Sequence, residues 1–151
     1  MIDGDVSLDR SVSTPSSEAH GFGVFGGVAH LSATPPVERH VVADFVAVFL
    51  QTLAEECLDR GADLIGHLKL HLRTDHGALR ASLVDHLAGP ALHNNLGEFP
   101  FAEGDLTVNA IVHGLDAENV RACVYVAARS AANGNLAVEW NSCVREREDA
   151  R

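Results

Sequence analysis

A run of alternating side chains between Leu64 and Leu72 constrains the fold of this chain more than any other feature. Every second residue from Leu68 onward is leucine, and three residues between them can carry a positive charge: His67, Lys69 and His71. Because successive side chains of a β-strand point to opposite faces, the run predicts a strand with a leucine face in the core. Its other face would then present cationic groups outside the core.

The same run also admits a helical alternative, because its leucines and Ile65 recur at helical spacing as well. Gly66 disfavours that alternative, since glycine lowers the stability of a helix. We therefore favour a strand over residues 64–73, a turn at 74–77 and a second strand over 78–85. A polar, glycine-containing turn between two alternating runs is typical of a β-hairpin.

Two other segments have the three- and four-residue apolar spacing of amphipathic helices. The first covers residues 37–60 and follows Thr34-Pro35-Pro36, because proline is tolerated in the first turn of a helix. The second covers residues 117–132. The apolar stripe of the first helix includes Val46 and Leu50 and is wider than one sheet face requires. This width indicates burial against a second subunit as well.

Composition along the chain predicts one domain between two tails. Residues 1–33 are predicted to be disordered or loosely attached, residues 34–142 to form a single α+β domain, and residues 143–151 to be a charged C-terminal tail. The glycines between 21 and 27 match the spacing Gly-x-Gly-x-x-Gly of dinucleotide-binding turns. Because no buried strand is predicted before them and prolines precede the next helix, we interpret them as a flexible or edge segment.

The rest of the domain predicts a further strand and a long connection. Residues 87–104 contain several glycines, asparagines and prolines and are predicted to be an irregular binding loop or lid. Residues 106–113 alternate as a third strand, and residues 136–140 suit a short closing strand. The predicted fold is therefore an α+β two-layer sandwich, an antiparallel sheet of three to four strands covered on one face by two helices, in the order α-β-β-β-α.

The composition disfavours several classes of protein. With 21 acidic and 11 basic side chains the formal net charge is −10, and aromatic residues make up only 5 % of the chain. Nucleic-acid binding is not expected, because it relies on basic surfaces and aromatic stacking. The longest apolar run, Val41–Leu50, contains Asp44 and is too short to span a bilayer, so no membrane partner is expected. No apolar signal-peptide region stands at the start, and we expect a cytoplasmic protein.

The three cysteines fit a reducing compartment. They are odd in number, widely spaced and form no Cys-x-x-Cys pair. Cys57 and Cys123 lie within the apolar helical patterns, where a free cysteine usually packs as a small apolar side chain. No zinc or redox motif is predicted from them.

The open face of the predicted sheet gives the candidate ligand-binding residues. With the leucines inward, strand parity places imidazoles, an ammonium, a guanidinium and an amide together on the other face. These candidates are His67, Lys69, His71, Arg80, Asn109 and His113. A positive face on an acidic protein is a place where an anionic ligand would bind.

No metal, cofactor or catalytic residue is predicted. Two histidines four residues apart on a strand, as at 67 and 71, are separated by about 13 Å at roughly 3.3 Å per residue, too far to share one zinc ion. The chain lacks the Gly-x-Ser-x-Gly elbow and the phosphate-binding loop of known nucleophilic and nucleotide-dependent enzymes.

We therefore interpret the chain as a non-enzymatic binding or assembly module that forms homo-oligomers. Its contacts would use the cationic open sheet face or the wide apolar first helix, with a small anionic ligand or another protein as further partners. The alternative is a small enzyme, or a metal- or anion-binding protein, with its site between that face and the 87–104 loop. In the enzyme, His67, His71 or His113 would act as acid or base, and Lys69 with Arg80 would hold an anion.

Overall fold

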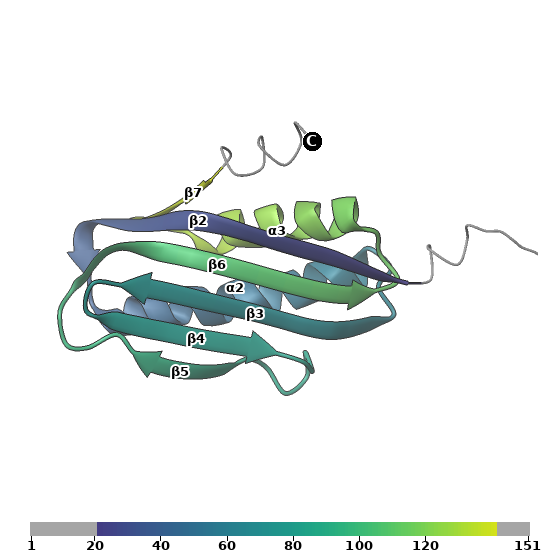
Figure 1. The fold of residues 1–151 in the computed structure, drawn as a ribbon, viewed down its shortest axis with the longest axis horizontal. Coiled ribbons are helices and arrows are strands. Elements are labelled where there is room, and N and C mark those ends of the chain that lie inside the picture. The colour runs from purple at the N-terminus through teal and green to yellow at the C-terminus, as the bar shows by residue number, and fades with distance from the viewer. Residues whose placement is uncertain (1–20, 142–151) are drawn as a thin grey trace, which may run out of the picture.

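Within residues 21–141, six antiparallel strands form one sheet, and two helices cover one of its faces (Figure 1). The computed structural model describes residues 21–141. Along the chain the elements are β2 (Phe22–Val37), α2 (Arg39–Asp59), β3 (Leu64–Thr74), β4 (Gly77–Leu83), β5 (Ala91–Asn95), β6 (Phe101–His113), α3 (Ala117–Ala131) and β7 (Leu136–Trp140). Across the sheet the strand order is β5-β4-β3-β6-β2-β7. The expected α+β class and antiparallel sheet are confirmed, with more strands than the predicted three to four.

The β3–β4 hairpin has the structure that the alternating leucines predict. Leu68, Leu70 and Leu72 are buried, whereas Lys69 and Arg73 on the other face are exposed and His71 is half-buried. The connecting turn is closed by Thr74, whose hydroxyl oxygen accepts the backbone N–H of His76 at 3.0 Å and of Gly77 at 3.1 Å. The strand interpretation of residues 64–73 is thus correct.

The core lies between the sheet and the helix pair and is almost entirely aliphatic. Helix α2 packs against β3, β4 and α3, and α3 also packs against β2. In α2 the side chains of Val46 and Leu50 are fully buried within this single chain. The wide stripe is therefore accounted for by α3 on one side and the sheet on the other, and it gives no indication of a second subunit.

Strand β2 corrects the expectation for the N-terminal part of the domain. Residues 22–33 were predicted to be loosely attached, but residues 22–32 pair with β6 and residues 29–33 pair with β7. The pairing with β6 shifts register between Ser32 and Val37. The two prolines of β2 lie in this gap, where β2 forms no regular pairs with β6 and their lack of an N–H removes no hydrogen bond. The helix accordingly begins at Arg39, after the strand. Residues 1–20 and 142–151 lie outside the described range.

Part of the predicted 87–104 loop is also a strand. Residues Ala91–Asn95 form β5, the edge strand beside β4, and β6 starts at Phe101, before the predicted boundary. In β5 only Leu92 and Asn94 alternate toward the helix-covered side, and no residue of the strand is fully buried. An edge strand this short and polar has almost no hydrophobic periodicity, so its sequence is typical of a loop.

Helix α3 starts at a side-chain cap. The carboxylate of Asp116 accepts the backbone N–H of Asn119 at 2.8 Å and its side-chain N–H at 3.0 Å. These two hydrogen bonds, the backbone one first, lower the pKa of Asp116, so the carboxylate stays charged at the positive end of the helix dipole. The Asp116 side chain thereby stabilises the first turn of α3.

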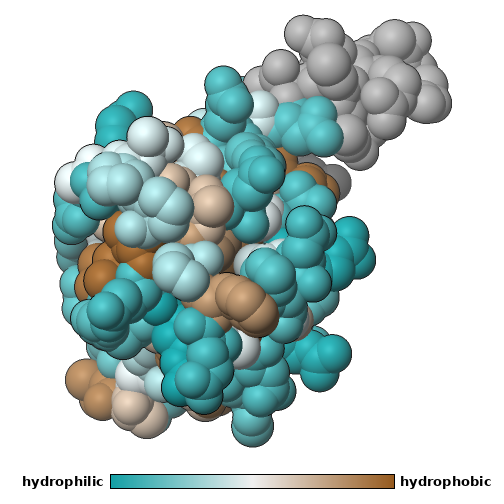
Figure 2. Space-filling view, turned by 90° about the vertical axis from the view of Figure 1, so that its left-hand side faces the viewer, coloured by the Kyte–Doolittle hydropathy of each residue, from teal (hydrophilic) through white to brown (hydrophobic). Residues whose placement is uncertain are grey.

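The end of the molecule at the left of Figure 1 comprises the β3–β4 turn and the β5–β6 connection. Figure 2 shows that this end is mostly hydrophilic, with small separate hydrophobic areas. Neither α2 nor α3 combines the length and apolar character that crossing a bilayer requires.

Candidate functional site: a cationic hollow on the open sheet face

The face of the sheet opposite the helices is turned toward the viewer in Figure 1, with α2 behind it. Cross-strand pairing fixes which side chains are neighbours on this face. One row of adjacent residues across four strands is His93, Arg80, His71 and Thr107. Directly opposed side chains in such a row have Cβ atoms about 5 Å apart.

A second row lies beside the first. It consists of Ala91, Ser82, Lys69, Asn109 and Gly26. The two rows surround a hollow of about 340 Å³, and Leu70 and Ala81 contribute to its lining. The hollow is thus formed by β3, β4, β5 and β6, and a rigid antiparallel sheet holds the side chains that line it.

The lining of this hollow has positive charge without a compensating carboxylate. Lys69 and Arg80 are exposed, and His71 and His93 add two imidazoles. Within residues 21–141 the ion pairs lie elsewhere, and none involves Lys69 or Arg80. Hydroxyl and amide groups of Ser82, Thr107 and Asn109 complete the polar lining. A bound anion would find charge complementarity and several hydrogen-bond donors here.

The structure brings four of the six predicted site residues together in this hollow and separates the other two. Lys69, His71, Arg80 and Asn109 line it. His67 lies further along β3, opposite Ile111 of β6, where a register shift in the pairing precedes it. It is half-buried and does not contribute to the lining.

His113, the sixth candidate, is held at the far end of β6. Its Nδ1 lies 2.9 Å from Oδ2 of Asp63, and its ring meets the ring of Phe22 edge-on at 5.0 Å. These contacts tie the end of β6 to the segment after α2 and to the start of β2. They give His113 a structural role distant from the hollow.

Sequence reasoning missed His93 as a lining residue. It lies in β5, which was predicted to be part of an irregular loop, so no strand parity was assigned to it. Only the observed pairing with Arg80 places it on the open face. The signal in the sequence was weak, because a single leucine marks the inward side of this strand.

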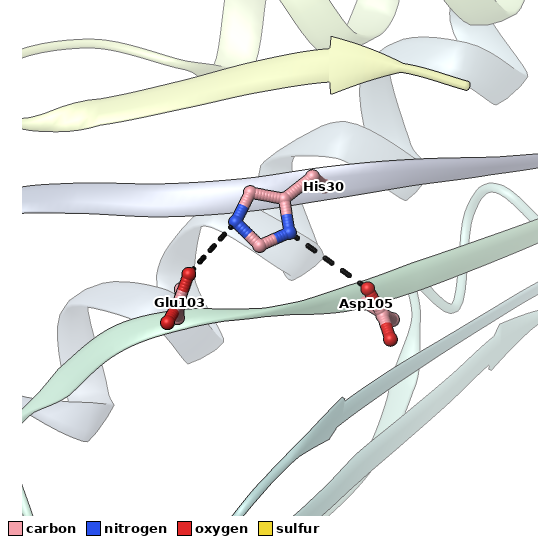
Figure 3. A network of polar contacts seen from close by, with 3 residues as sticks. All are labelled: His30, Glu103 and Asp105. Atoms are coloured by element: carbon pink, nitrogen blue, oxygen red, sulfur yellow. Dashed lines mark hydrogen bonds and ion pairs between the residues drawn. The ribbon is translucent and has the colours of Figure 1, made fainter. Parts of the chain in front are cut away.

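A second polar cluster lies on the same face toward the other edge of the sheet (Figure 3). His30 of β2 sits between two carboxylates of β6: its Nε2 is 3.1 Å from Oε1 of Glu103, and its Nδ1 is 3.7 Å from Oδ1 of Asp105. The open face is therefore cationic over β3 and β4 and acidic over the start of β6. Among the described residues, no group of three or more histidine, cysteine or acidic side chains is placed to hold a metal ion.

Comparisons with known proteins add no further assignment. No family model, curated protein or solved structure matches the chain. The function is therefore argued from the geometry of this site alone.

Proposed function

We propose that this protein is a non-enzymatic binding module for small anions and that the hollow around Lys69 and Arg80 is its binding site. The observation that carries the proposal is the gathering of Lys69, His71, Arg80 and His93 around one hollow with no carboxylate in its lining. Lys69 and Arg80 make this a local positive area on a chain of net charge −10. Mutual repulsion between the cationic groups is relieved when an anion binds among them.

The lining of the hollow suits the binding of an anion. Each lining side chain extends from a paired strand, and the polar groups suit recognition of phosphate, sulfate or carboxylate oxygens. The enzymatic alternative would use the same hollow with His71 or His93 as acid or base. Conversion of a bound anion into a product would favour that alternative.

The binding proposal is tested by calorimetric titration with inorganic phosphate, pyrophosphate and citrate at low ionic strength. We expect at least one of these anions to bind and to raise the melting temperature, because a ligand that binds only the folded state stabilises it. The double substitution Lys69→Ala with Arg80→Ala should weaken binding by about tenfold or more, since a charge-assisted hydrogen bond contributes about 1.5–3 kcal/mol. Raising the salt concentration should also weaken it.

Arg129→Ala is the matched control. Arg129 is exposed on α3, on the helix-covered side of the sheet, and its loss changes the net charge by the same amount as each test substitution. Affinity should therefore change little in this variant. Lys69→Ala and Arg80→Ala are also measured singly for this comparison. If none of the anions binds, or if Arg129→Ala weakens binding as much as Lys69→Ala or Arg80→Ala alone does, the hollow is not the site.

Self-association is a second candidate function, and one observation about β2 favours it. Strand β7 pairs only with residues 29–33 of β2, so within the described chain residues 22–27 have no strand on that side. Phe22 and Val24, both exposed, lie on this segment, and it carries no charged side chain. Sheet edges of monomeric proteins are usually protected by charges, prolines or short length. We propose that a second copy pairs here, β2 against β2.

Light scattering over a range of protein concentrations tests this pairing. We expect a dimer that the substitution Val24→Lys converts to a monomer, because a charge at an exposed edge opposes strand addition. High salt should favour the dimer by screening the charge repulsion between acidic copies. A chain ending at Asn141 serves as the comparison: dimerisation only after this truncation would mean that residues 142–151 cover the edge. A monomer in both chains would exclude the pairing.

A further inference from the structure

A second hollow runs along β2 and meets the cationic one. Its volume is about 720 Å³, and on the open face it is lined by Val24, Gly26 and Val28 together with Thr107 and Asn109. Thr107 and Asn109 also line the cationic hollow. The two hollows therefore share these residues of β6 and form one trough across the open face, from β4 to β2.

Gly26 keeps this trough open. It stands directly opposite Asn109 in the β2–β6 pairing, and a Cβ atom added to it would lie 3.3 Å from Oδ1 of the Asn109 side chain. Any larger side chain at this position would stand in the trough, because residue 26 faces the open side of the sheet. This glycine belongs to the run that resembles a dinucleotide-binding turn by spacing alone, and the structure gives it a different role.

The β2 end of the trough is apolar. Val24 is 57 % exposed and lies opposite Ile111, which is 38 % exposed, and Val28 is 38 % exposed. On the open face the charged groups lie at β3 and β4 on one side and at His30, Glu103, Asp105 and Glu139 on the other. Where the hollow passes the edge of β2 toward α3, Glu118 and Arg121 also line it. On the open face, the trough thus has a cationic end over β3 and β4 and an apolar stretch over Val24, Gly26 and Val28 of β2.

We propose that the ligand is an amphipathic organic anion, with its anionic group between Lys69 and Arg80 and its apolar part lying over Gly26 and Val28. This inference rests on the proposed anion-binding function and adds the chemical class of the ligand. The distance from β3 to β2 is about 10 Å at the usual spacing of neighbouring strands. A medium-length alkyl or aromatic group attached to a phosphate or carboxylate fits that distance.

A chain-length series of alkyl phosphates tests the inference, with inorganic phosphate, methyl, butyl, hexyl and octyl phosphate titrated below the concentrations at which they form micelles. We expect the affinity to rise along the series, by up to about fourfold for each methylene that becomes buried. The increments should be smaller than this limit because the trough is open to solvent on one side. Lys69→Ala should weaken the binding of every member of the series by a similar factor.

Two substitutions should remove the chain-length dependence, which is compared as the change in affinity per methylene within each variant. The affinity for inorganic phosphate is measured separately in Gly26→Val, because the added side chain contacts Asn109 of the cationic hollow. Gly26→Val fills the trough, and Val28→Thr keeps the shape of the side chain but makes its surface polar. Ala137→Val is the control, because it adds two methyl groups on the same face in β7, outside both hollows. Its chain-length series should equal that of the unmodified protein.

The outcomes separate this inference from the proposed function. If inorganic phosphate binds but longer chains bind no more tightly, the ligand is a simple anion and the inference is overturned while the anion site stands. If flat chain-length dependence accompanies a dimer that Val24→Lys disrupts, the apolar end belongs to a second copy. If the affinity still rises with chain length in both Gly26→Val and Val28→Thr, the alkyl chain binds elsewhere, and the inference is also overturned. If no anion binds, both proposals fail together.

Discussion

Replacing Leu50 with alanine is expected to destabilise the fold by about 2–5 kcal/mol, the usual range for removing a buried leucine side chain. Leu50 is fully buried in α2, at a position that the sequence pattern assigns to a second subunit. Because the single chain already buries it, the loss should appear in the unfolding free energy of the isolated molecule. Denaturant unfolding followed by circular dichroism measures it directly.

Two comparisons make the Leu50 result decisive. Leu53→Ala removes an equally buried leucine of the same helix and should cost a similar amount. Val48→Ala removes an apolar side chain that is 49 % exposed on α2 and should change stability by only a few tenths of a kcal/mol. If Leu50→Ala is as mild as Val48→Ala in dilute solution, and if the unfolding midpoint of the unmodified protein rises with its concentration, a subunit contact buries Leu50 instead.

The β3–β4 hairpin and both helices could be predicted because their periodicity is long and one face is strongly apolar. From Leu68 to Leu72, every residue on one face of β3 is a leucine, and this apolar face is buried in the core. Strand parity then also placed Lys69, His71 and Arg80 on the opposite face. This part of the candidate site follows from local pattern alone.

Strand β2 could not be predicted, because its glycines are explained only by tertiary neighbours. A Cβ atom at Gly23 would lie 2.3 Å from the backbone oxygen of Leu115, so the approach of the β6–α3 connection requires glycine there. At Gly27 the ring of Phe25 occupies the space, 2.7 Å from an added Cβ atom. In the sequence, a run with so many glycines is typical of a flexible segment. In the structure, Gly23 and Gly27 lie at tightly packed positions of a strand.

The places of the remaining site residues are set by strand pairings that leave no signal in the sequence. His93 joins the hollow because β5 pairs with β4, and Gly26 joins the trough because β2 pairs with β6. His113 was assigned to the correct face, but its contact with Asp63 reflects the path of the chain after α2. Local patterns thus gave the face of the six predicted residues, and the order of strands across the sheet decided which of them meet.

The second large effect is expected in thiol reactivity. Cys57 of α2 and Cys123 of α3 are fully buried, as their apolar helical patterns predict, and neither forms a disulfide. Burial, followed by the proximity of Cys123, raises the pKa of the Cys57 thiol, and burial also raises the pKa of Cys123. Because the thiolate is the reactive form, both should be labelled only when the helices separate.

In a Cys143→Ser variant, which removes the cysteine outside the described residues, labelling by a thiol reagent at neutral pH should be slowed by more than about a thousandfold relative to the unfolded chain. This factor corresponds to global opening of a fold with a stability of at least about 5 kcal/mol. Mass spectrometry after timed quenching measures the rate for each cysteine. Fast labelling of both in the native state would contradict the packing of α2 on α3.

The two buried thiols also make the unfolding free energy depend on pH, and the sign of this dependence follows from their raised pKa values. A folded-state pKa above the ordinary thiol value of 9.0 means that the native state retains protons that the unfolded chain releases. The two thiols therefore contribute stability that is complete below pH 9 and is lost as the pH rises above that value. Unfolding free energies measured from pH 7 to pH 10.5 should fall more steeply for this Cys143→Ser protein than for a variant that also carries Cys57→Ala and Cys123→Ala. Since the triple variant has a lower stability at neutral pH but no buried thiols to ionise, its shallower slope would assign the difference to Cys57 and Cys123.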